Sequence, residues 1–201
     1  MPTNTNILLI RHGEKPDSDT DPTLTVAGQE RAQAYVVYFQ NYAISKSSAP
    51  LKLGYLFAAA DSNESHRPVL TITPLADALN LAINQTYPDS GYSSLATDIL
   101  GDSSYDSANL LICWHHEEIL ELAQALGVNP SSLPVAAAWP KTWPNSVYGW
   151  VLQLVYGADG QIDVTQTRCL NEKLMDDDHG QDPPGANPEK RTAEYPRAAV
   201  G

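Results

Sequence analysis

Cysteine is scarce in this sequence, which contains only Cys113 and Cys169 among its 201 residues. Each lies in or near the end of an apolar run, so we expect two buried thiols rather than a disulfide framework or a cysteine-based metal site. Long apolar runs are also missing, and residues 1–6 lack the basic and then apolar order of a signal peptide. These absences argue against a membrane protein and favour a cytoplasmic one.

Positively charged residues are also few. Twelve Lys and Arg residues stand against 24 Asp and Glu residues, which gives a formal net charge of −12. Such a charge repels nucleic-acid backbones and anionic membrane surfaces, although a small anion can still bind at a local cationic pocket. The length suits one domain, which we expect over residues 1–170. A polar, acidic and proline-rich tail follows over 171–201, and we expect it to be poorly ordered.

Near the start of the chain, an apolar run ends in a charged turn. The four aliphatic residues 7–10 suit a strand that is buried on both faces, and open α/β sheets bind ligands at the carboxyl ends of such strands. Arg11 and His12 follow directly, and Gly13 allows a sharp turn or a close approach to a ligand. The planar guanidinium of Arg11 matches phosphate oxygens. Alone, this triplet is equally compatible with an ordinary loop.

Two later strands end in similar polar groups. A strand predicted over residues 51–60 is followed by a polar segment and Arg67, and a strand over 110–114 is followed by His115 and His116. If the sheet is mainly parallel, these strand ends share one rim with His12. Phosphoryl transfer through histidine needs fixed donors for the equatorial oxygens, an in-line nucleophile and an acid for the leaving oxygen. The arginines and histidines at the rim meet the first two needs.

The remaining pattern alternates helices with strands, which favours an α/β fold. Thr25 is a plausible N-cap for the first helix, and Pro74 should bend or restart the second. The Gly-, Ser- and Tyr-rich segment 87–105 is expected to be an insertion over the rim. The other predicted elements are helices over 24–43, from 68 onward and over 119–126, a short strand over 81–86, and a pair of strands over 147–156 and 162–170.

Taken together, these motifs resemble those of the histidine phosphatase superfamily, the phosphoglycerate mutase-like proteins. The likeness covers roughly residues 5–156 and implies a three-layer α/β/α fold with a mainly parallel central sheet. It also implies a phosphohistidine intermediate. The motifs that carry it, in chain order, are Arg11-His12-Gly13, Leu24-Thr25-x-x-Gly28-x-x-Arg31-Ala32, Arg67-x-x-x-Thr71, and the strand that ends in histidine before Ile119.

By this resemblance His12 is the nucleophile, and Arg11, Arg67 and the late histidine bind the phosphoryl oxygens. The implied activity is hydrolysis of a small phosphate monoester by a phosphatase without a cofactor. The alternatives are a phosphoglycerate-type mutase and a catalytically inactive protein that binds a phosphorylated ligand on the same fold. We prefer the phosphatase because the rim lacks an obvious extra basic set for a second phosphate or carboxylate.

His115 and His116 compete for the role of the late histidine. Side chains alternate along a strand, so the two rings point to opposite faces, and counting back from the next helix can favour either. We favour His116, and we expect Glu117 to be the proton donor because an acidic residue follows this histidine in the phytase-like branch of the superfamily. Asp61 and Asp98 are the reserve acids.

Further contacts with the substrate are expected from Gly13, Lys15 and His115. Imidazoles and carboxylates also ligate zinc, so the run from His115 to Glu118 has a rival interpretation as a metal site. A metalloprotease helix requires His-Glu-x-x-His, and the second histidine position is occupied here by Leu120. We therefore expect no metal.

Overall fold

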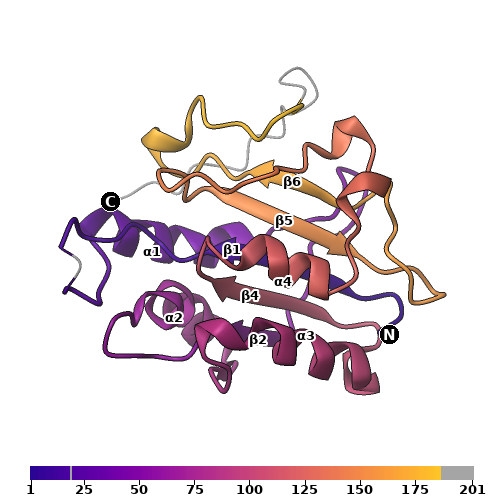
Figure 1. Ribbon diagram of the computed structural model, residues 1–201, viewed down its shortest axis with the longest axis horizontal. Helices are drawn as coiled ribbons and strands as arrows, with labels where there is room; N and C mark the ends of the chain where they lie inside the picture. Colours follow the sequence, from indigo (N-terminus) through magenta and orange to yellow (C-terminus); the bar gives the residue numbers. More distant parts are fainter. Residues whose placement is uncertain (19, 187–201) are drawn as a thin grey trace.

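A six-stranded sheet forms the centre of the computed structural model, which describes residues 1–18 and 20–186 (Figure 1). The strand order is β3-β2-β4-β1-β5-β6. The first four of these run parallel to one another, whereas β5 is antiparallel to β1 and β6 to β5. The strands are β1 (Asn6–Arg11), β2 (Tyr55–Ala58), β3 (Ile83–Asn84), β4 (Asn109–Trp114), β5 (Trp150–Val155) and β6 (Arg168–Asn171).

Helices cover both faces of this sheet. Alternation along β1 sends Leu8 and Ile10 into a core with α1 and α2, and Ile7 and Leu9 into a second core with α3 and α4. The expected three-layer α/β/α architecture with a mainly parallel sheet is therefore confirmed. The helices are α1 (Val26–Gln40), α2 (Arg67–Leu79), α3 (Tyr92–Gly101) and α4 (Ile119–Ala125).

Some predicted elements differ in extent. Residues 87–105, expected as an insertion over the rim, contain α3, whose Leu95 and Ile99 are buried in the core. One helix, α2, runs through Pro74 without restarting. The strand predicted over 162–170 begins only at Arg168, although Ile162 forms an isolated antiparallel bridge with Tyr156, just after β5. These differences arise because tertiary packing sets where an element ends more strongly than local pattern does.

The expected boundary at residue 170 is not where packing ends. Glu172 is 7% exposed and Asp178 only 1% exposed, and the indole of Trp150 donates to the carbonyl of Gln181 at 2.6 Å. Residues 171–186 therefore continue the domain, and the remainder of the predicted tail, 187–201, lies outside the described residues. Over the described ranges, no helix combines the length and apolar character needed to cross a membrane.

Candidate active site

The carboxyl ends of β1, β2 and β4 bring the predicted site residues together. The register pairs Arg11 with Trp114, and the N–H of His12 still donates to the carbonyl of Trp114 at 3.1 Å. The same register makes His115 the neighbour of His12, and the centres of their rings are 5.2 Å apart. Arg67 begins α2 after β2, and its charge contributes to lowering the pKa of His12. Residues from three strand ends thus share one site.

His12 is held as a neutral ring. Its side chain is buried, and its Nδ1 lies 2.7 Å from the carbonyl oxygen of Gly13. Because a carbonyl can only accept, Nδ1 carries the proton and Nε2 keeps its lone pair. Burial lowers the pKa of His12 well below its usual value, and the charge of Arg11 lowers it further. The imidazole is therefore uncharged and nucleophilic at neutral pH.

Arg11 is fully buried and fixed from one side. Its Nη1 donates to three backbone carbonyls of one loop, those of Pro144 at 3.4 Å, Asn145 at 2.7 Å and Val147 at 2.9 Å. Its Nε and Nη2 are buried without a hydrogen-bond partner among the described residues. Burial lowers the pKa of Arg11 to about 10, so the guanidinium stays charged at neutral pH. These two nitrogen atoms, with three N–H bonds between them, thus remain available to an anion.

Arg67 is arranged in a similar way. Its Nη1 donates to the carbonyl of Asp21 at 2.9 Å and its Nη2 to that of Glu64 at 3.3 Å, while its Nε is buried without a partner in the described part of the chain. Burial lowers its pKa. The carbonyls that hold both arginines are uncharged, and within residues 1–18 and 20–186 no carboxylate pairs with either guanidinium before an anion arrives.

The other motif residues hold the loop that carries His12. The N–H of Gly13 donates to the hydroxyl of Thr71 at 2.8 Å, and that hydroxyl donates to the carbonyl of Arg67 at 2.7 Å. Thr25 caps α1 through the N–H of Gly28. A Cβ at Gly28 would lie 2.6 Å from the carbonyl oxygen of Glu14, so only glycine allows α1 to approach this loop so closely.

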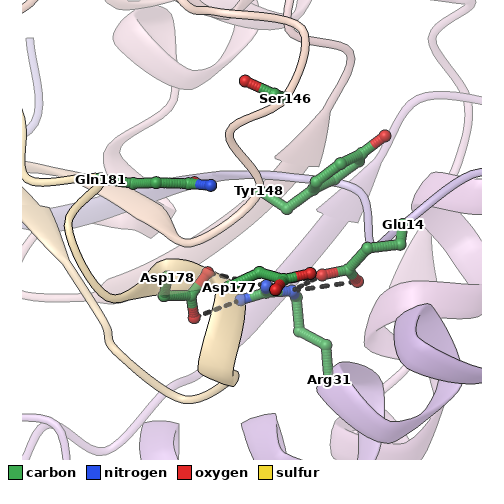
Figure 2. A pocket seen from close by; sticks show the side chains of 7 residues that line it. All are labelled: Glu14, Arg31, Ser146, Tyr148, Asp177, Asp178 and Gln181. Atoms are coloured by element: carbon green, nitrogen blue, oxygen red, sulfur yellow. Dashed lines mark hydrogen bonds and ion pairs between the residues drawn. The ribbon is translucent and has the colours of Figure 1, made fainter.

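Arg31 joins the same loop to the C-terminal segment (Figure 2). Its guanidinium binds Glu14 at 2.6 Å, Asp178 at 2.9 Å and Glu172, and it is 1% exposed. Burial raises the pKa of Glu172 to about 8, against the attraction of Arg31, because three carboxyl groups share one guanidinium. We refer to these four residues as the Arg31 cluster.

His116 contacts residues other than His12. Its Nε2 is 2.7 Å from the side-chain oxygen of Asn145, and its Nδ1 is 2.7 Å from Glu117. The sequence favoured His116 as the late histidine that binds the phosphoryl oxygens, whereas the ring that adjoins His12 in the structure is that of His115. The reason is the register between β1 and β4, which no local pattern in the sequence reveals. Burial and the charge of Arg67 lower the pKa of His115 to about 4, so its ring is neutral.

The remaining predicted site residues, which are Glu117, Lys15 and Gly13, have different environments. The Glu117 side chain is 62% exposed, and its charge raises the pKa values of Arg11, Arg67 and His115 against the effect of burial, which places it near the rim. Lys15 is exposed. Both backbone groups of Gly13 are used within the protein, by His12 and by Thr71.

The two reserve acids are engaged elsewhere. Asp98 accepts from the hydroxyl of Tyr87 at 2.6 Å, and Asp61 lies 3.5 Å from His66. A pair that sequence reasoning missed, Asp89 and Glu118, interacts near Glu117. Burial, followed by repulsion from nearby carboxylates, raises the pKa of Asp89 to about 6 and that of Glu118 to about 7. No sequence spacing signals this pair, because its members come from separate segments.

The loop 144–148 was also missed as part of the site. Its carbonyls hold Arg11, the side chain of Asn145 contacts His116, and the ring of Tyr148 lies against the guanidinium of Arg11. In the sequence this stretch joins the end of a proline- and tryptophan-containing connection over 130–144 to the strand predicted from 147, and no motif marked it. A cavity of about 260 Å³ lies beside it, and its lining includes Glu14, Tyr148 and Asp178 (Figure 2).

Comparison with solved structures places this site on a known fold. The protein histidine phosphatase SixA, solved with tungstate, superposes with a TM-score of 0.53 at 14% identity, over 83% of this chain and 97% of that one. A phosphoglycerate mutase from Bacillus anthracis str. Sterne is less similar, with a TM-score of 0.46 at 13% identity, over 82% and 96% of the two chains. No protein-family model matches the chain, and no curated protein sequence matches it significantly.

The superposition on SixA shows that the chain has the fold of a histidine phosphatase. The resemblance recognised in the sequence motifs is thereby confirmed at the level of the fold.

Proposed function

We propose that this protein is a phosphatase that hydrolyses a small phosphate monoester through a phosphohistidine on His12. The observation that carries the proposal is the neutral His12 ring, whose Nδ1 is held by the carbonyl of Gly13 while Nε2 keeps its lone pair. Around it, Arg11 and Arg67 present buried N–H groups that no described residue satisfies. Neutral nucleophile and unused cationic donors together suit attack on a phosphoryl group.

The reaction then has two steps. In the first, Nε2 of His12 attacks phosphorus, the bond to the ester oxygen breaks, and that oxygen takes a proton from Glu117, which enters this step in its protonated form and regains the proton in the second step. Arg11, Arg67 and His115 bind the three equatorial oxygens as their charge changes. In the second step, Glu117 removes a proton from water, which attacks phosphorus and releases phosphate from His12.

The arrangement of cationic groups favours hydrolysis over mutase-type transfer. A mutase must hold a phosphorylated product until it accepts the phosphoryl group again, which requires further cations around the substrate. Arg31 is already bound by three carboxyl groups, and Lys15 is exposed. The formal net charge of −12 also opposes a substrate with several negative groups.

The test is turnover of p-nitrophenyl phosphate by the full chain and by His12→Ala. We expect phosphate release by the native protein and a loss of at least about 10⁴-fold in the variant, because no neighbouring side chain can replace an in-line nucleophile. His66→Ala is the matched control, because that side chain is 42% exposed and lies against Asp61. Unchanged turnover in His12→Ala would refute the proposal, and a native protein that binds phosphate without turnover would favour the inactive binding protein.

A further inference from the structure

The ring of Tyr148 contacts Arg11 and also lines the cavity beside the Arg31 cluster, and it has no role in the mechanism above. The Cζ atom of Arg11 lies 3.9 Å from the centre of its ring, within the range of a cation–π contact. Its ring centre is also 6.1 Å from that of His12. Tyr148 is half-buried, whereas the guanidinium that it covers is fully buried. One ring thus touches the arginine and adjoins the nucleophile.

The hydroxyl of Tyr148 points away from Arg31 and Asp178 in Figure 2, although the ring lies above these two residues in that view. Burial is the largest influence on the pKa values of Arg11 and Arg67 and lowers both, and among the charged groups that oppose it Tyr148 ranks first for each. The Tyr148 side chain therefore lies close enough to both guanidiniums to influence their pKa values. It forms no hydrogen bond with any of the described residues.

The backbone that carries Tyr148 is held firmly. The next residue, Gly149, packs so closely on Asp178 that a Cβ there would lie 2.3 Å from a carboxylate oxygen. The carbonyl of Gly149 also accepts from the N–H of Glu172 at 2.8 Å. On the other side of Tyr148, the carbonyl of Val147 binds Arg11. The backbone on both sides of Tyr148 is consequently held, by Arg11 on one side and by Asp178 and Glu172 of the Arg31 cluster on the other.

We propose that Tyr148 is a further substrate-binding residue whose hydroxyl donates a hydrogen bond to a non-bridging phosphoryl oxygen held by Arg11 and Arg67. This role rests on the proposed function. The ring stacks on Arg11 and so directs the hydroxyl, and the phenolic oxygen keeps lone pairs that can face the guanidiniums while its proton faces the anion. Tyrosine adds a donor here without adding a charge, which limits the desolvation cost at the buried site.

The experiment compares Tyr148→Phe with the native protein. This substitution keeps the ring on Arg11 and removes only the hydroxyl, so the expected loss is that of one hydrogen bond to a charged group, about 10- to 100-fold. The inhibition constant of inorganic phosphate should rise by a similar factor. Because the bond goes to a non-bridging oxygen, p-nitrophenyl phosphate and an alkyl phosphate should lose rate equally. Tyr55→Phe is the matched control, because Tyr55 lies at the amino end of β2 and its hydroxyl binds the carbonyl of Ser104.

Each possible outcome either supports or overturns the proposed contact of Tyr148. Unchanged phosphate inhibition and turnover in Tyr148→Phe would overturn the proposal, as would a loss confined to the alkyl ester, because that pattern belongs to a proton donor for the leaving group. Direct titration with inorganic phosphate keeps the test independent of catalysis. If the native protein binds phosphate without turnover, the proposed hydrolysis fails, but weaker phosphate binding by Tyr148→Phe would still support the contact.

Discussion

At the scale of single residues, a backbone carbonyl determines what His12 can do. The carbonyl of Gly13 places the proton on Nδ1 of His12 and leaves Nε2 with a free lone pair, which is the proposed nucleophile. The carbonyls of the 144–148 loop likewise orient Arg11 without neutralising it. Neutral acceptors thus orient both groups while preserving their capacity to react or to bind an anion.

The second histidine provides a test at this scale. We expect His115→Ala to lower the rate by about 10²-fold or more, like the loss of an oxyanion donor, because this ring adjoins His12. The matched variant His116→Ala should have a mild effect on p-nitrophenyl phosphate, because that ring contacts Asn145 and Glu117 rather than His12 and the leaving group of this ester needs no proton donor. Steady-state kinetics of both variants on one ester provide the comparison. A severe loss in His116→Ala together with a mild one in His115→Ala would contradict the assignment.

At the scale of elements, the site depends on how closely α1 approaches the loop after β1. Gly13 and Gly28 meet at this contact, and a Cβ on either would press against backbone of the other segment. Thr71 of α2 holds the same loop by a hydrogen bond. Helices α1 and α2, on one face of the sheet, therefore hold the loop that carries His12. The motif residues Gly28 and Thr71 act through this packing rather than by contact with a substrate.

Gly28→Ala tests this contact. The added Cβ would lie 2.6 Å from the carbonyl oxygen of Glu14, so we expect a loss of about 1–3 kcal/mol in the free energy of unfolding despite the better helix propensity of alanine. Catalytic activity should fall as well, because Glu14 belongs to the catalytic loop. Gly101→Ala is the control, since a Cβ there has no atom within 4 Å. Urea denaturation of both variants measures the effect, and equal stabilities would argue against it.

The sequence predicted these strand ends correctly because apolar runs followed by polar groups are local signals. It missed the register of β4 on β1, and with it the neighbour of His12, because register depends on pairing between distant segments. It also missed the packing of residues 171–186. The acidic composition there favoured disorder, but Arg31, 141 positions before Glu172, offers these carboxylates a buried cation. Long-range pairing of charges has no periodicity that a sequence pattern can display.

At the scale of the whole molecule, the Arg31 cluster joins the catalytic loop, α1 and the C-terminal segment. Because Glu172 is buried there and lies beside a second carboxyl group, Asp178, its pKa is raised from the ordinary value of 4.5 to about 8 despite the attraction of Arg31. The unfolded chain loses that proton at lower pH than the folded one. The stability that the proton confers is therefore complete below about pH 4.5 and is lost as the pH rises to about 8.

Glu172→Gln removes this titration. We expect the free energy of unfolding of the native protein to fall across this pH range and that of the variant to fall less steeply, because the amide resembles the protonated carboxyl group. Glu30→Gln makes the same change at an exposed position of α1 and should leave the slope unaltered. Urea denaturation at a series of pH values supplies both profiles. Parallel profiles for Glu172→Gln and the native protein would contradict the account.

The central claim is that His12 carries the phosphoryl group between the two steps of the reaction. Rapid quenching of the full chain with a phosphate ester in alkali, followed by peptide mass spectrometry, locates that group directly. We predict an acid-labile, alkali-stable phosphoryl group on His12 that forms before phosphate is released and then decays. Full turnover with no such intermediate, or with the phosphoryl group on any other side chain, would contradict the account.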